Sequence, residues 1–112
     1  MTLNEYQTLA QRTSNKALDN KGHLFNGVLG LAGEAGECAD LMKKHYFQDD
    51  RPFVHLLEDE LGDVLWYVAE TAAALGVSLE EVAARNVEKL KKRYPEGFEA
   101  ERSLHREVNG DA

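Results

Sequence analysis

Two pairs of carboxylates in the chain have a spacing that could bind a divalent cation. Glu34 and Glu37 are three residues apart, and Glu60 and Asp63 repeat this spacing further along the chain. On a helix, residues three apart lie on one face, about a turn from each other. Each pair also borders a row of apolar residues at helical spacing, so both pairs are expected to face the interior. Converging carboxylates in a partly dry site repel one another unless a cation neutralises them.

The ligand atoms indicate which cation would bind. Sites made only of oxygen favour magnesium, manganese or calcium over zinc or copper. Magnesium also shares its coordination shell with phosphate groups, so it would let an acidic protein bind a nucleoside triphosphate. We therefore expect Mg²⁺, with Mn²⁺ as a substitute. The alternative is that these are ordinary solvated helix residues, since Glu is a good helix former. A di-iron site would need Glu-x-x-His pairs, which the sequence lacks.

Composition and charge narrow the classes of partner. The 112 residues are 43% hydrophobic and 29% charged, as in a globular domain, and 20 acidic against 13 basic residues give a formal net charge of −7. This charge would repel duplex nucleic acid. No apolar run approaches the ~20 residues needed to span a bilayer, and the first residues lack a signal-peptide pattern, so we expect a cytoplasmic protein without membrane contact. The single cysteine, Cys38, excludes an internal disulfide and a zinc site of several thiolates.

The elements that must position the carboxylates are helices. Apolar residues at helical spacing predict helices over residues 3–17, 23–47, about 50–75 and about 78–94, with a weak helical run over 100–108 before a frayed end. The third is expected to start at Asp50 and Pro52. No strand pattern appears, so the predicted fold class is all-α with a four-helix core. We expect one domain over residues 1–98, a tail over 99–112, and assembly as a dimer or tetramer because the chain is small.

Glycine recurs every third residue in the second predicted helix. Gly27, Gly30, Gly33 and Gly36 are all helix-interior positions, where glycine costs roughly 1 kcal/mol against alanine. Two explanations stay open at this point. Another helix could approach closely along this face, or the backbone could leave room for a ligand or metal. Both can hold together.

The carboxylate pairs carry a family resemblance. Glu34-Ala-Gly-Glu37 followed by Glu60-Leu-Gly-Asp63 resembles the E-x-x-E and E-x-x-D signature of MazG-like nucleotide pyrophosphohydrolases. The similarity continues through LGLAGEAGECADLMKK and EDELGDVLWYV to the segment NVEKLKKRYP, and covers roughly residues 20–98. It implies a helical-bundle core of the all-α superfamily to which the dimeric dUTPases are related. It also implies magnesium bound by all four carboxylates, and hydrolysis of nucleoside triphosphates between the α and β phosphates.

The resemblance further suggests roles for individual residues. Glu34 is our choice for orienting or deprotonating the attacking water. On the fourth predicted helix, Asn86, Lys89 and Arg93 are three and four apart and so share one polar, cationic edge, which Lys92 can also reach. The family pattern suggests that Asn86 and Lys89 contact the phosphates with Arg93 nearby. The alternative is a solvated basic end stabilised by the helix dipole.

Recognition of the base is less visible in the sequence. Aromatic residues at helical spacing are more often part of a core than of a ligand site. We name only Trp66 and His23 as candidates for contact with the substrate base.

The predicted function is metal-dependent hydrolysis of NTPs or dNTPs to the monophosphate and pyrophosphate, for sanitation or control of the nucleotide pool. The alternatives are a noncatalytic helical binding or regulatory module that has kept the fold, and a metal-binding structural bundle without turnover. The presence of all four acidic motif positions favours the enzyme.

Overall fold

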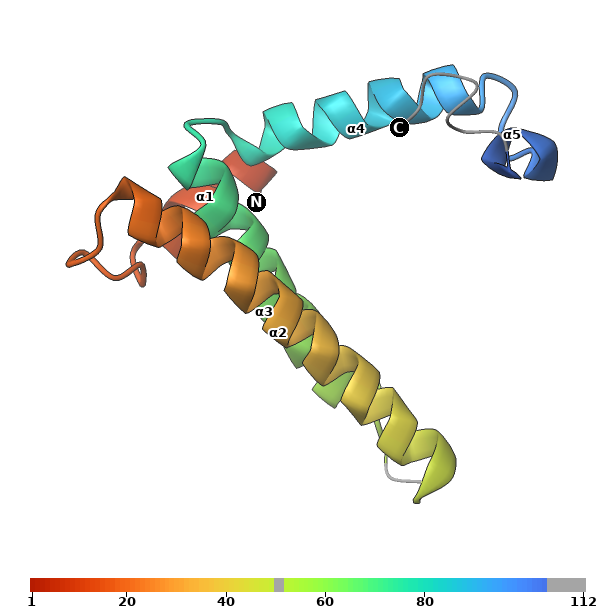
Figure 1. Ribbon diagram of the computed structural model, residues 1–112, viewed down its shortest axis with the longest axis horizontal. Helices are drawn as coiled ribbons and strands as arrows, with labels where there is room; N and C mark the ends of the chain where they lie inside the picture. Colours follow the sequence, from red (N-terminus) through yellow and green to blue (C-terminus); the bar gives the residue numbers. More distant parts are fainter. Residues whose placement is uncertain (50–51, 105–112) are drawn as a thin grey trace. The chain divides into compact units, whose positions relative to one another are not determined.

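The computed structural model describes residues 1–49 and 52–104, and no strand forms in this part of the chain. Its helices are α1 (Leu3–Gln11), α2 (Asn20–Phe47), α3 (Val54–Ala74), α4 (Leu79–Arg93) and α5 (Ala100–Leu104) (Figure 1). The predicted all-α fold is confirmed, and α1 to α4 correspond to the four predicted helices. The predicted start signal at Asp50, the end of the weak helical run and the frayed terminus lie outside the described residues.

Side-chain caps determine where α1 and α2 begin. The Thr2 hydroxyl accepts from the Glu5 amide at 3.0 Å, and the Thr2 amide donates to the Glu5 carboxylate at 3.1 Å, which completes a capping box. The Asp19 carboxylate accepts from the Gly22 amide at 2.7 Å. Because Asp19 caps the helix, α2 begins at Asn20, three residues before the start predicted from its apolar pattern.

The first helix ends at Gln11, six residues before its predicted end. Polar side chains beyond this point bond to nearby backbone. The Thr13 hydroxyl donates to the Ala10 carbonyl at 2.9 Å, and the Asn15 side-chain oxygen accepts from the Ala17 amide at 3.0 Å. Such local bonds compete with the helical pattern. The chain therefore makes a bent connection between α1 and α2, and this connection later supplies residues to the site.

Helices α2 and α3 lie side by side and antiparallel along their length (Figure 1). Two of the regularly spaced glycines allow this approach. A Cβ atom at Gly27 would overlap Thr71, and one at Gly30 would overlap the ring of Tyr67. The next two glycines of the series have no such neighbour within 4 Å. Close packing therefore explains the first half of the glycine series, and the second half borders open space.

The described chain divides into two compact units, Met1–Leu79 and Glu80–Ala112. The single domain over residues 1–98 stays a prediction. The core of the first unit consists of buried small and aliphatic residues with larger partly buried ones around them: Ala10, Ala69, Ala72, Leu79, Tyr6, Trp66, Val68 and Val77. Gly76, at φ 76°, ends α3 with a backbone conformation that glycine adopts without steric cost. Within the described ranges, no helix has the length and apolar character needed to cross a membrane.

The Gln7 side chain of α1 makes hydrogen bonds to the backbone of the segment that follows α3. The Gln7 amide nitrogen donates to the Val77 carbonyl at 3.1 Å, and the Gln7 side-chain oxygen accepts from the Leu79 amide at 3.0 Å. Both partners are backbone groups that follow the end of a helix and would otherwise need another partner. Gln7 thereby closes the first unit around the end of α3.

Candidate active site

Three carboxylates from two helices meet on the α2–α3 pair. Glu34 comes from α2, and Glu60 and Asp63 come from α3. One oxygen of each lies within 4.8 Å of the others. Glu34 and Glu60 are partly buried, whereas Asp63 is exposed. The antiparallel packing of the two helices brings Glu34 to Glu60 and Asp63, which lie 26 and 29 positions later in the sequence.

Negative charge surrounds Glu60 in this cluster. A hydrogen bond with the Glu34 side chain raises the pKa of Glu60, and so do burial and the negative charges of Glu34, Asp63 and Asp59. A hydrogen bond between two carboxyl groups requires a shared proton. Glu60 Oε2 is also shielded from solvent and has no hydrogen-bond partner in the described part of the chain. A divalent cation coordinated by oxygen would satisfy this atom and take the place of the proton.

The fourth predicted ligand, Glu37, is not part of this group. It lies on α2 one turn beyond Glu34 and its side chain is exposed. Its spacing from Glu34 puts both on the same side of the helix. The structure therefore assembles three of the predicted carboxylates and leaves Glu37 beside them in solvent.

A cavity adjoins the carboxylate cluster. Its volume is about 360 Å³, and it is lined by Thr13, Glu34, Asp63, Trp66 and Tyr67. Cavities that bind small molecules commonly have roughly 300 to 1,000 Å³. The cavity therefore has room for a ligand of nucleotide size, with carboxylates and aromatic rings in its wall.

Trp66, a predicted base contact, lines this cavity with its polar group already bonded. The indole N–H donates to the Thr13 hydroxyl at 2.8 Å and to the Ala10 carbonyl at 3.1 Å. Its ring meets the Tyr67 ring edge to face, with centroids 5.0 Å apart. Because the N–H has partners, Trp66 can offer a ligand only the apolar surface of its ring.

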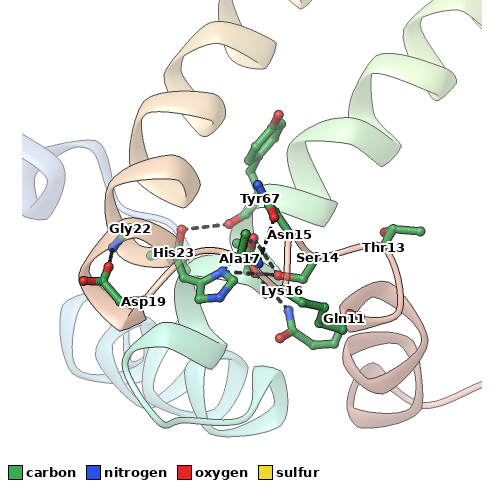
Figure 2. A network of polar contacts seen from close by, with 12 residues as sticks. Gln11, Thr13, Ser14, Asn15, Lys16, Ala17, Asp19, Gly22, His23 and Tyr67 are labelled. Carbon is green, nitrogen blue, oxygen red and sulfur yellow. Dashed lines mark hydrogen bonds and ion pairs between the residues drawn. The ribbon is translucent and has the colours of Figure 1, made fainter.

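His23, the other predicted base contact, belongs to a second polar cluster in the same unit (Figure 2). At its centre is Glu70 of α3, whose side chain is only 1% exposed. The Ser14 hydroxyl lies 2.8 Å from Glu70 Oε1, and the Gln11 amide nitrogen lies 3.2 Å from the same oxygen. His23 Nδ1 is 3.3 Å from Ser14 Oγ and 3.6 Å from Glu70 Oε2. We call Gln11, Ser14, His23 and Glu70 the Glu70 cluster.

Glu70 was not among the residues that the sequence analysis singled out. A signal for it existed, because it is the one charged residue in the stretch Val64–Leu75, which is otherwise apolar or weakly polar. A glutamate in such a run must find partners or cost free energy. Its partners come from α1, from the connection that follows α1 and from the first turn of α2, so the sequence alone did not reveal them.

The predicted phosphate contacts lie on α4, in the second compact unit. Asn86, Lys89 and Lys92 are exposed along this helix, three residues apart. Arg93, in contrast, is only 8% exposed. The first three residues therefore form an accessible polar and cationic edge, whereas Arg93 is buried.

Together these features define an all-helical protein that presents an E-x-x-E and E-x-x-D carboxylate site on two antiparallel helices. Comparison with known families gives a match over residues 26–98 to the MazG nucleotide pyrophosphohydrolase domain. The chain belongs to this family, and the resemblance predicted from the sequence is confirmed.

A relative from a virus agrees with the family assignment. The "Gene 37 protein" of Mycobacterium phage L5 is 44% identical over an alignment of 74 residues, and the match covers 62% of this chain and 65% of the relative's length. The match thus spans slightly less than two thirds of either protein. No solved structure gave a significant match.

Proposed function

We propose that this protein hydrolyses NTPs or dNTPs between the α and β phosphates, with release of the monophosphate and pyrophosphate, in sanitation or control of the cytoplasmic nucleotide pool. The observation that carries this proposal is the meeting of Glu34, Glu60 and Asp63 beside a cavity of about 360 Å³ in a member of the pyrophosphohydrolase family. An uncompensated carboxylate cluster next to such a cavity suits a ligand that brings phosphates and a cation together.

Glu34, Glu60 and Asp63, with Glu37 beside them, would hold Mg²⁺, and Mn²⁺ could replace it. The donor set supports a cation of this type because it consists only of carboxylate oxygens, one of which, Glu60 Oε2, has no partner in the described residues. When bound, the cation would neutralise phosphate charge and make a water more acidic. Rotation of the exposed Glu37 side chain would add a fourth carboxylate.

The protein's own residues would orient the reactants. Glu34 would hold the attacking water and accept its proton as the water oxygen bonds to the α phosphorus. The bond from that phosphorus to the bridging oxygen then breaks, and pyrophosphate leaves with the electron pair. Asn86 and Lys89, with Lys92 and Arg93, would stabilise the phosphate charge. The exposure of the first three supports this role, and the burial of Arg93 makes it the weakest phosphate ligand of the four.

We also propose that the protein assembles as a homodimer or homotetramer. Large apolar side chains are exposed on α2 and α3, including Phe25, Val28, Leu29, Leu61 and Leu65. Their spacing of three or four residues puts Phe25 with Val28 and Leu29 on one side of α2, and Leu61 with Leu65 on one side of α3, and exposed apolar faces are typical of contacts between proteins. Sedimentation equilibrium of the purified protein would give the number of copies, and a monomer at micromolar concentration would contradict this part of the proposal.

The test of the activity is a panel of canonical and modified NTPs and dNTPs, incubated with Mg²⁺ or with EDTA. Chromatography of the products distinguishes monophosphate from diphosphate, and a coupled assay measures pyrophosphate. We expect monophosphate and pyrophosphate only with the metal. Diphosphate and orthophosphate would contradict the assigned bond. No turnover across the panel, with helical content intact by circular dichroism, would instead favour a noncatalytic binding module.

A further inference from the structure

A second, smaller cavity borders the Glu70 cluster. Its volume is about 140 Å³, and its wall is formed by six residues: Gln11, Asn20, His23, Glu70, Ala73 and Ala74. An engineered protein cavity of about 150 Å³ is known to hold benzene. This cavity is thus large enough for one six-membered ring.

Some donors and acceptors of the Glu70 cluster are not used by the contacts within it and can bind a ligand. A serine hydroxyl has one proton, and the 2.8 Å contact to the Glu70 carboxylate uses it. In the 3.3 Å contact between Ser14 and His23, Nδ1 must then be the donor. A neutral imidazole protonated at Nδ1 carries its lone pair on Nε2. In its neutral form His23 therefore keeps Nε2 as an acceptor.

The same accounting leaves further acceptors in this wall. The Gln11 amide nitrogen donates one of its two protons to Glu70, so the Gln11 side chain keeps its carbonyl as an acceptor and one N–H as a donor. Glu70 Oε1 receives both short contacts. Oε2 has only a shared contact with the Ser14 hydroxyl at 3.1 Å and His23 Nδ1 at 3.6 Å, which is beyond hydrogen-bond distance. Acceptors thus outnumber donors in this wall, and the exposed Asn20 amide at its edge can both donate and accept.

The position of this cavity relates it to the carboxylate site. Asp63 and Glu70 are seven residues apart on α3, which places them on the same helix face about 10 Å from each other. Tyr67 lies between them on α3 and lines the larger cavity next to Asp63. A nucleotide whose phosphates lie at Asp63 could therefore direct its base along α3 toward Glu70.

We infer that the Glu70 cavity binds the amino-bearing edge of a pyrimidine base, with Glu70 accepting from the exocyclic amino group and Asn20 and His23 completing the contacts. This inference rests on the proposed nucleotide hydrolysis and names a specificity determinant for it. Carboxylates accept well from the amino group of cytosine. An oxo group at the same ring position would place its oxygen against the Glu70 carboxylate, so that two acceptors would face each other and Glu70 would gain no donor from the ligand.

The test compares two ligands whose bases differ only along this edge: cytosine has a 4-amino group and an unprotonated N3, whereas uracil has a 4-oxo group and an N3–H. Cytidine and uridine monophosphates are titrated into the full chain by isothermal calorimetry without metal. We expect the cytidine nucleotide to bind at least about tenfold more tightly, because sites built to hydrogen-bond a ligand group reject the analogue that lacks it. Glu70→Gln should reduce this ratio to near one, since an amide can donate to an oxo group as well as accept from an amino group.

Two further variants separate recognition from structure. Glu58→Gln makes the same chemical change at an exposed position of α3 and should preserve the ratio. Ala74→Leu should fill the cavity while keeping the Glu70 cluster, and should weaken cytidine nucleotide binding with unchanged helical content. Equal affinities for the two nucleotides in the wild-type protein, or an unchanged ratio in folded Glu70→Gln, would overturn the inference. If triphosphates are hydrolysed with no preference for the amino group, the inference about base recognition is wrong and the proposed function stands. If the cytidine nucleotide binds selectively and no triphosphate is hydrolysed, the proposed hydrolase activity is wrong and the inference about the cavity stands.

Discussion

Two carboxylates on α3 have opposite surroundings. Glu60 is hydrogen-bonded to another carboxyl group, and one of its oxygens is shielded with no partner in the described chain. Glu70, further along the helix, is more deeply buried, yet it receives bonds from Ser14 and Gln11. Burial is therefore a poor marker of a cation site in this protein. The chemical type of the neighbouring groups is the better marker, because acceptors facing acceptors require a proton or a metal.

The largest expected effect is the loss of turnover when a carboxylate of the proposed cation site is replaced. Asp63→Asn or Glu37→Gln should abolish pyrophosphate release, because each removes a negative ligand from the proposed cation site, and should leave helical content nearly unchanged. A coupled pyrophosphate assay and circular dichroism measure the two properties. Asp40→Asn is the matched control, since Asp40 lies on α2, is exposed and pairs with Lys44 at 2.8 Å. Normal activity in either purified variant would contradict the mechanism in which four carboxylates hold the cation.

Substitution of Glu70 should have the larger effect on stability. Glu70→Ala leaves the Ser14 hydroxyl and the Gln11 amide without their acceptor, which typically costs about 1–3 kcal/mol of unfolding free energy. Asp63→Asn, at an exposed position, should change stability by no more than about 0.5 kcal/mol. Urea denaturation followed by circular dichroism compares them. Equal stability of both variants would show that the Glu70 cluster does not hold the fold together.

A smaller effect should distinguish phosphate binding from base recognition. Lys89→Ala should raise KM about five- to tenfold, as expected for loss of roughly 1 to 1.5 kcal/mol of hydrogen bonding. The increase should be equal for cytidine and uridine triphosphates, because phosphates are common to both, whereas Glu70→Gln should change their ratio. Lys91→Ala is the control, since Lys91 lies on the same helix and contacts Glu88 at 3.5 Å. Unchanged kinetics in Lys89→Ala would remove this residue from the site.

The smallest expected effect is a dependence of thermal stability on pH and Mg²⁺. The pKa of Glu60 is raised by the Glu34 hydrogen bond, by burial and by neighbouring negative charge, so the folded protein binds this proton more tightly than the unfolded chain does. The resulting stability is present at low pH and is lost as the pH rises from the ordinary glutamate value of 4.5 through the raised pKa. Mg²⁺ at neutral pH should compensate for the lost proton.

Differential scanning fluorimetry with and without Mg²⁺, from pH 4 to 8, tests this expectation. Mg²⁺ should raise Tm at the upper end of this range and have little effect at the lower end, where protons compete for the same oxygens. Glu60→Gln should abolish the response and Glu58→Gln should keep it. If Mg²⁺ does not change the Tm of the wild-type protein at any pH, this result would contradict cation binding at this cluster.

Local patterns in the sequence predicted most of the helical structure. The capping box of Thr2 and Glu5 and the apolar periodicity of α2 and α3 act over one or two turns, so they can be recognised without knowing the fold. The end of α1 was predicted too late, because the bonds made by Thr13 and Asn15 outweighed a continuing helical pattern.

What the sequence by itself determined is the set of helices, the spacing of the carboxylates on each of them and the family to which the chain belongs. Only the tertiary structure decided which carboxylates meet and which find donors. Glu60 faces Glu34 because Gly27 and Gly30 let α2 and α3 approach closely, and Glu70 is satisfied by Ser14, 56 residues earlier. A helical pattern specifies a face, whereas the partner of that face depends on contacts between distant segments.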